Sequence, residues 1–137
     1  MKKYIYIFLI ILVLIAVILA GYLNKNKQNN DNKKMKVQNS EDVISVRVKE
    51  ETEGGYVYYK TEDKELIEKV INALDNIKIE EKTDISFSDN GKTYILELSD
   101  GTTQEYYFQG SYYCKDKINY KISNYKELNK IEIPKKN

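Results

Sequence analysis

The chain has 137 residues with 22 basic and 21 acidic side chains, so its formal net charge is only +1. That total hides a split, because residues 1–40 carry seven lysines and one aspartate (net +6), whereas residues 41–137 carry 15 basic and 20 acidic groups (net −5). A folded part of about 95 residues holds one hydrophobic core, which excludes a multidomain enzyme, and its acidic surface disfavours nucleic acid as a partner because it repels phosphate.

The first predicted element is a membrane-spanning helix over residues 4–23, which contain no charged side chain. About 20 helical residues are enough to cross a hydrocarbon core of ~30 Å. Tyr4 and Tyr22 lie at its two ends, where amphipathic rings suit the lipid head groups. A cleaved secretory signal is the alternative, but its apolar stretch is shorter, about 7–15 residues, and the large Ile18 fits a small-residue cleavage site poorly. We therefore expect an uncleaved transmembrane anchor in residues 1–23.

Charge alone leaves open the side of the membrane on which the rest of the chain lies. Lys2 and Lys3 favour a cytoplasmic N-terminus, whereas five lysines soon after the apolar segment favour a cytoplasmic body under the positive-inside rule. The short basic start followed by a long apolar run is arranged like a signal, and long domains translocate largely regardless of charge. We expect a single-pass protein of the cell membrane with an extracytoplasmic body.

Residues 24–42 are predicted to form a flexible polar stalk. They are rich in Asn, Lys and Gln and have almost no apolar content. Such a segment cannot bury enough surface to offset the entropy of ordering it. We expect it to tether the anchor to a globular domain over residues 43–137.

The globular domain begins with a predicted β-hairpin. Ile44, Val46 and Val48 alternate with polar residues, as in a half-buried strand. A turn over residues 53–55 then leads into a second strand over residues 56–60.

One strong amphipathic helix is predicted after the hairpin. Thr61 is the expected N-cap, and Glu62 and Asp63 lie in the first turn, where the helix dipole favours negative charge. Apolar residues at helical spacing then form a continuous stripe, namely Leu66, Ile67, Val70, Ile71 and Leu74.

The remaining sequence is predicted to be mainly β. Turns are expected over residues 89–91, 100–101 and 115–117. Ile85 and Phe87 are expected to share a face of one strand, and further alternating strands follow the first of these turns. Consecutive hairpins imply an antiparallel β meander with the one main helix packed on one face, so the expected fold class is α+β in two layers.

The residue inventory argues against catalysis and against a metal site. A Ser or Cys nucleophile usually needs a neighbouring base, most often His, and the chain has no His. Zinc lacks its usual His and Cys ligands, and the single Cys114 is expected to be a small buried residue on a strand. Adjacent carboxylates are explained by solvation or by a helix start. We therefore expect no enzyme activity, no catalytic residue, no cofactor and no metal.

The tyrosines are the most distinctive feature, since ten of the 13 lie in the globular domain. Doublets such as Tyr106-Tyr107 and Tyr112-Tyr113 place one ring on each face of a sheet, and one helix covers only one face. Tyr107, one of the second doublet, and Tyr58 are expected on the uncovered face. We take Tyr58, Tyr107 and Tyr112 as candidate partner-binding residues, because tyrosine is a preferred interface residue. The alternative is compositional, since an A/T-rich genome raises Tyr, Lys, Asn and Ile together.

Several segments resemble small extracytoplasmic domains of low-GC Gram-positive bacteria: the helix over residues 61–74, the strand that ends at Asp100-Gly101, the Tyr106-Tyr107-Phe108 strand and the Tyr120-x-Ile122 pattern. Those domains occur as short single-anchor proteins, and similar ones are appended to membrane antirepressor metallopeptidases of the beta-lactam-sensing type. The resemblance covers residues 43–133. The peptidase's His-Glu-x-x-His zinc motif is absent from the chain, so no catalytic residue carries over. The resemblance implies a surface-anchored accessory or sensory domain that faces outward.

These observations together predict a membrane-anchored, noncatalytic extracytoplasmic domain that binds a protein or envelope ligand through a Tyr-rich sheet face. The alternative is an inhibitor or immunity-type protein that acts on a membrane or envelope enzyme. The alternative differs by predicting one tight partner and a phenotype only when that enzyme is present.

Overall fold

The structure, a computed structural model, describes residues 2–31, 34–86 and 90–136. It divides into two compact units, Met1–Lys33 and Lys34–Asn137, which we describe separately. Phe87 of the predicted strand and Asp89 of the predicted turn lie outside the described residues.

The first unit contains one long helix, α1 (Lys2–Asp31). Its segment Tyr4–Lys25 is long and apolar enough to cross a membrane, a criterion that a signal sequence near an N-terminus can also meet. The helix continues beyond this segment into residues that we predicted as flexible stalk. The physical reason is that adding residues to an existing helix costs much less than starting a new one.

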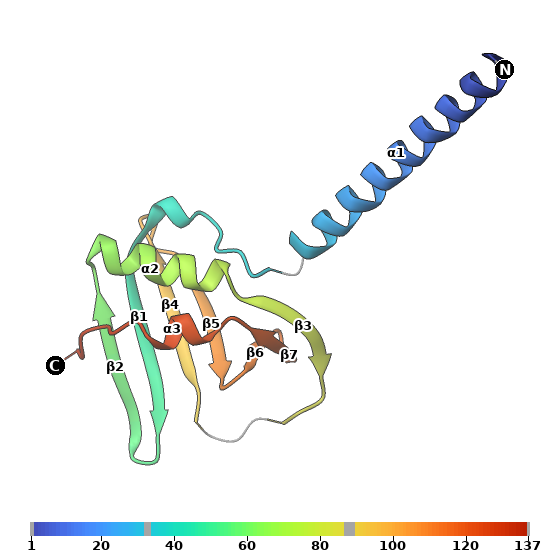
Figure 1. Ribbon diagram of the computed structural model, residues 1–137. Coiled ribbons are helices and arrows are strands. Elements are labelled where there is room, and N and C mark those ends of the chain that lie inside the picture. The colour runs from blue at the N-terminus through green and yellow to red at the C-terminus, as the bar shows by residue number, and fades with distance from the viewer. Residues whose placement is uncertain (1, 32–33, 87–89, 137) are drawn as a thin grey trace. The chain divides into compact units, whose positions relative to one another are not determined.

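Within the described part of the second unit, seven strands form one antiparallel sheet in the order β2-β1-β4-β5-β6-β7-β3 (Figure 1). The strands are β1 (Val43–Thr52), β2 (Gly55–Thr61), β3 (Lys78–Thr83), β4 (Lys92–Leu98), β5 (Thr103–Gln109), β6 (Tyr112–Lys115) and β7 (Ile118–Ser123). The helices are η1 (Ser40–Asp42), α2 (Lys64–Asp75) and α3 (Lys126–Asn129). Helices α2 and α3 lie over one face of the sheet (Figure 1), which confirms the α+β class.

The position of β3 differs from a simple series of hairpins. Strands β4 to β7 form the predicted meander, but β3 pairs with β7 at the far edge of the sheet and not with β4. The turn predicted over residues 89–91 therefore does not join two neighbouring strands. Strand β3 is mostly exposed and carries four charged side chains, a composition that suits an edge strand.

Helix α2 begins at a different cap from the predicted one. Asp63 is the N-cap, and its Oδ1 accepts a hydrogen bond from the backbone N–H of Leu66 at 2.9 Å. Thr61 is the last residue of β2, and its Oγ1 accepts from the backbone N–H of Asp63 at 3.1 Å. Because β2 continues to Thr61, the helix starts later and the connection between strand and helix is short.

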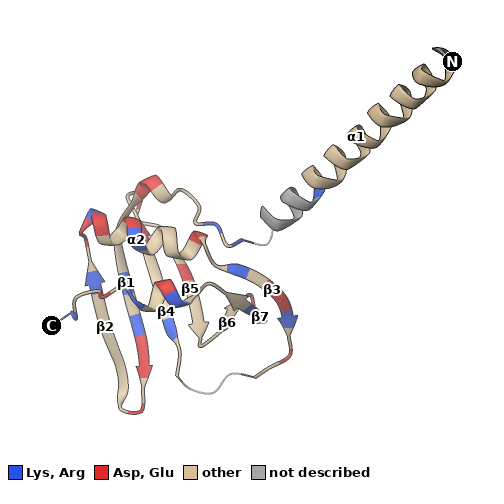
Figure 2. Cartoon of the chain, in the orientation of Figure 1, with Lys and Arg blue, Asp and Glu red and all other residues tan. Residues whose placement is uncertain are grey.

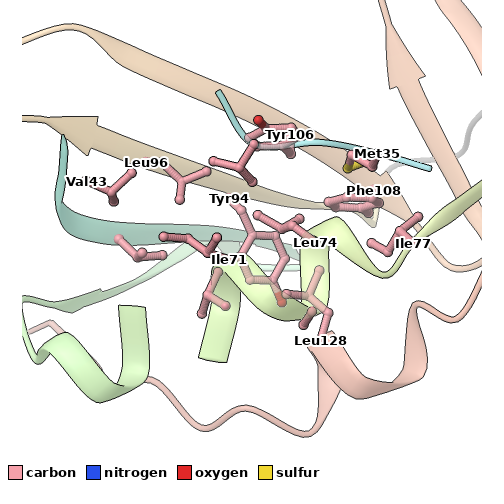
Figure 3. Packing of buried hydrophobic residues seen from close by; sticks show 14 of the residues in the cluster. Met35, Val43, Ile71, Leu74, Ile77, Tyr94, Leu96, Tyr106, Phe108 and Leu128 are labelled. Atoms are coloured by element: carbon pink, nitrogen blue, oxygen red, sulfur yellow. The ribbon is translucent and has the colours of Figure 1, made fainter. Parts of the chain in front are cut away.

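The core lies between the sheet and the layer that contains α2 and α3 (Figure 3). Its large, fully buried side chains come from both layers, namely Leu74, Ile77, Leu96, Val46 and Val70. An aromatic row crosses the sheet beneath the helices. In it the Tyr94 and Phe108 ring centroids are 5.9 Å apart, and those of Phe108 and Tyr113 are 5.3 Å apart. Such pairs add stabilisation beyond the area that they bury.

Part of the predicted stalk belongs to this core. Met35 and Val37 are buried in the same cluster. The Met35 N–H donates to the Ile77 carbonyl at 2.9 Å, and the Val37 N–H donates to Asp75 Oδ1 at 2.7 Å. These bonds satisfy an extended backbone, in which alternate side chains point to the same side. The globular unit therefore begins at Lys34 and not at the later boundary that we predicted.

Both edge strands of the sheet have an additional backbone neighbour. The Lys136 N–H donates to the Tyr58 carbonyl at 2.9 Å on the outer edge of β2. Lys34 forms a β-bridge with Lys78 at the start of β3. Short segments at both ends of the globular unit thus pair with the two edges of the sheet.

Candidate binding face of the sheet

The strand register defines the sheet face opposite α2 and α3, which we call the outer face. Residues that are direct cross-strand partners lie on the same face. One row of partners on the outer face is Tyr58, Lys49, Thr93, Tyr107 and Cys114. A second row is Lys60, Arg47, Ile95 and Glu105. Two pairs beside the first row complete the centre of the face, Tyr56 with Glu51 and Gln109 with Tyr112.

The three tyrosines singled out from the sequence lie on this face. Tyr58 is 48% exposed, and Tyr107 and Tyr112 are half-buried. Their neighbours Tyr106 and Tyr113 are buried on the helix side of the sheet. Of the second doublet, therefore, Tyr112 is the residue that faces outward.

Tyr107 lies directly against the backbone of Gly91. A Cβ atom added to Gly91 would lie 2.3 Å from the Tyr107 Oη and 2.4 Å from its Cε2. Gly91 also exchanges hydrogen bonds with Glu51, whose N–H donates to the Gly91 carbonyl at 2.9 Å and whose Oε2 accepts from the Gly91 N–H at 3.2 Å. Gly91 of the Asn90-Gly91 pair thus allows the Tyr107 ring to pack closely against the backbone.

Aromatic and basic side chains adjoin one another at the β1–β2 end of the outer face. The Lys49 Nζ lies 3.8 Å from the centroid of the Tyr56 ring, within the range of a cation–π contact. The Tyr56 and Tyr58 ring centroids are 6.5 Å apart. Both rings are exposed, so this part of the face offers apolar area next to positive charge.

Arg47 on the outer face has a buried polar atom without a hydrogen-bond partner. It lies directly between Lys60 on β2 and Ile95 on β4, and its buried Nε has no hydrogen-bond partner. Across the described residues, the ion pairs of the structure include neither Arg47 nor the exposed Glu105 of the same row. Like charges directly opposite each other destabilise a sheet, so Arg47 and Lys60 repel.

The charges of this row are separated along the strand order. The register places Arg47 and Glu105 on either side of Ile95. Figure 2 shows basic colour on β1 and β2 and acidic colour on β5, with further acidic colour at the end of β1 that belongs to other rows. One half of the row is therefore positive and the other half is negative.

Cys114 lies in the Tyr107 row and is half-buried, so it is less buried than we predicted. Among the residues that the structure describes, no group of three or more His, Cys, Asp or Glu side chains is placed to hold a metal ion.

The helix side of the sheet also contains a polar cleft, of about 340 Å³. Glu50 and Lys92 form an ion pair there at 3.3 Å, with both side chains half-buried. Burial, together with the nearby Glu50 carboxylate, raises the pKa of Tyr94 to about 12. The pKa of Tyr59 is raised by the same two causes and by its hydrogen bond to Glu50. Glu50 and Lys92 are partners of each other, so we assign this pair to the folded structure.

No protein-family model, curated protein or solved structure matches the chain.

Sequence reasoning missed five residues of the outer face, namely Arg47, Lys49, Tyr56, Ile95 and Glu105. The alternation along β1 was a sufficient signal that Arg47 points away from the core. Its neighbours across β4 could not be identified from the sequence, because the pairing of β1 with β4 joins segments almost 50 residues apart.

Proposed function

We propose that the protein is a membrane-anchored, noncatalytic domain whose body lies outside the cytoplasm and binds a protein or envelope ligand through the outer face. The observation that carries the proposal is the gathering of Tyr58, Tyr107 and Tyr112 with Arg47 and Lys49 on one side of the sheet. Tyrosine and arginine are enriched among the residues that contribute most to binding at protein interfaces.

The membrane part of the proposal is supported by the apolar helix segment Tyr4–Lys25. The outward orientation is supported by the signal-like order of a short basic start and a long apolar run, and by the resemblance to outward-facing domains. Digestion of intact cells with an external protease tests it. We expect the body to be cleaved, and a body that stays intact until the cells are lysed would contradict the orientation.

The noncatalytic part of the proposal is supported by the composition of the chain, which offers no His as a general base for a nucleophile. The ion pair Glu50–Lys92 is internally satisfied, and the tyrosines of the outer face are more suited to contact than to proton transfer.

Capture of envelope components by the full chain, solubilised in detergent, tests the binding face. We expect the combined Tyr58→Thr, Tyr107→Thr and Tyr112→Thr variant to lose the captured ligand, because it removes three rings while keeping residues that favour strands. Near-UV circular dichroism should show that the buried tyrosines still pack. Unchanged capture by this variant would refute the face assignment.

A matched control carries three substitutions on the helix side, Lys64→Ala, Glu68→Ala and Asn72→Ala, all at exposed positions of α2. We expect it to capture the same ligand as the natural chain. The inhibitor or immunity-type alternative predicts a distinct result, namely capture of a single envelope or membrane enzyme whose activity falls when the complex forms.

A further inference from the structure

We infer that the partner of the outer face is the outer face of a second copy of this chain, arranged about a twofold axis that runs along β4. The inference rests on the proposed function, because it names the partner of the same face. The inference rests on the order of side chains across the sheet. When a second copy faces the first with its strand order reversed, the side chains of β1 and β2 meet complementary side chains of β5 and β6.

A twofold axis along β4 places β1 of one copy opposite β5 of the other, and β2 opposite β6, because the sheet order is β2-β1-β4-β5-β6. Such a contact is isologous, so each pairing occurs twice. Two sheets can pack face to face in this way with their strands nearly aligned, about 10 Å apart.

The charged row supplies the first complementary pairing. Arg47 on β1 meets Glu105 on β5 of the second copy, and Ile95 between them meets its own counterpart on the axis. Arginine and glutamate side chains are long enough to meet across a gap of about 10 Å. The contact gives Arg47 a carboxylate, which it lacks among the described residues of its own chain.

The rows that contain the tyrosines supply the second complementary pairing. Lys49 meets Tyr107 of the other copy, a pairing of ammonium and ring, and Tyr56 meets Tyr112. Thr93 faces its own counterpart on the axis. The three tyrosines predicted from the sequence thus all lie within the five strands that the axis brings together.

Glu97 is expected to weaken the proposed dimer. It lies on β4, where the axis brings it towards its own counterpart, although its Oε2 accepts a hydrogen bond from the Ser45 hydroxyl at 2.9 Å and is drawn towards β1. Like charges that face each other weaken an interface. Glu97→Gln is therefore expected to tighten the pair severalfold.

The area of contact indicates a modest affinity. The contact spans five strands at a spacing of ~4.8 Å. Along each strand it spans four outer-face positions, which are ~6.8 Å apart, and this corresponds to roughly 600 Å² on each copy. A standard interface uses about 800 Å² on each partner. The pair is therefore weak in dilute solution, and anchoring of both copies in one membrane raises their effective concentration.

Charge reversal at Arg47 and Glu105 tests the arrangement in the full chain, with sedimentation velocity in detergent over a series of protein concentrations. Arg47→Glu and Glu105→Arg each replace two attractive contacts by two repulsive ones, so each is expected to raise the dimer dissociation constant at least about tenfold. A mixture of the two variants is expected to restore the dimer, because one face is then doubly acidic and the other doubly basic.

Lys64→Glu and Glu68→Arg are the matched controls, since they make the same charge changes on the exposed side of α2. They are expected to leave the dissociation constant unchanged. A monomeric natural chain, equal effects of test and control variants, or a mixture that stays monomeric would each overturn the inference. If the chain is monomeric but the triple tyrosine variant still loses a captured ligand, only the second copy is refuted, and the proposed function stands.

Discussion

Replacing Met35 by alanine tests whether the segment before β1 is structural. Met35 is only 5% exposed and lies in the core cluster, and its N–H is bonded to the Ile77 carbonyl. Truncation of a buried Met to Ala removes its transfer free energy and leaves a cavity, at a cost of about 2–5 kcal/mol. That is a large part of the 5–15 kcal/mol that typically stabilises a domain.

The measurement is urea unfolding of residues 34–137, followed by the near-UV circular dichroism of the buried tyrosines. We expect Met35→Ala to lower the free energy of unfolding by at least about 2 kcal/mol, and the Tm by at least about 8 °C. Lys36→Ala is the matched control, because this neighbour is exposed. Its effect should stay within about 0.5 kcal/mol.

The reasoning is refuted if Met35→Ala and Lys36→Ala unfold at the same urea concentration with the same slope. That result would mean that residues 34–37 do not pack on the core, and that the originally predicted boundary at residue 43 describes the folded unit better. A fragment that begins at residue 43 provides an independent check, since it should then be as stable as the longer one.

Three further predictions concern the outer face, the buried rings and the helix start. Gly91→Ala should displace the Tyr107 ring at a cost of about 1–3 kcal/mol and weaken outer-face binding, measured by urea unfolding and by capture. The pKa of Tyr94 and that of Tyr113 are each raised to about 12 from 10.0, so the stability they confer is present below pH 10 and is lost as the pH rises towards 12. Absorbance titration at the tyrosinate band should show this late ionisation diminish in the Tyr94→Phe variant. Asp63→Ala removes the N-cap bond of α2 and should cost about 1 kcal/mol of unfolding free energy.

The local patterns of the sequence predicted most of the fold. Alternating apolar residues identified the strands on both sides of residues 100–101, and the stripe from Ile67 to Leu74 identified α2, because burial of these residues follows directly from the period of each element. Local patterns also separated Tyr107 from Tyr106, since neighbours on a strand face opposite sides.

Non-local pairing limited the remaining predictions. The Asn90-Gly91 signal is strong for a hairpin, yet β3 is paired at the far edge of the sheet, where its charged side chains are tolerated. Met35 and Val37 were assigned to a stalk because two apolar residues among many polar ones do not indicate burial unless their tertiary neighbours are known. The pairing of Arg47 with Ile95 on β4, and through it the row that leads to Glu105 on β5, was hidden for the same reason.

The backbone contacts on the two edge strands bear on how the protein can assemble. An open edge invites another chain to add a strand, and repeated addition leads to fibres. Lys136 bonded to Tyr58 on β2, and Lys34 bridged to Lys78 on β3, occupy edge positions that such growth needs. The dimer that we propose instead forms through the outer face, where a twofold contact closes after two copies. A variant that loses either edge contact should therefore change from limited pairing to open-ended aggregation.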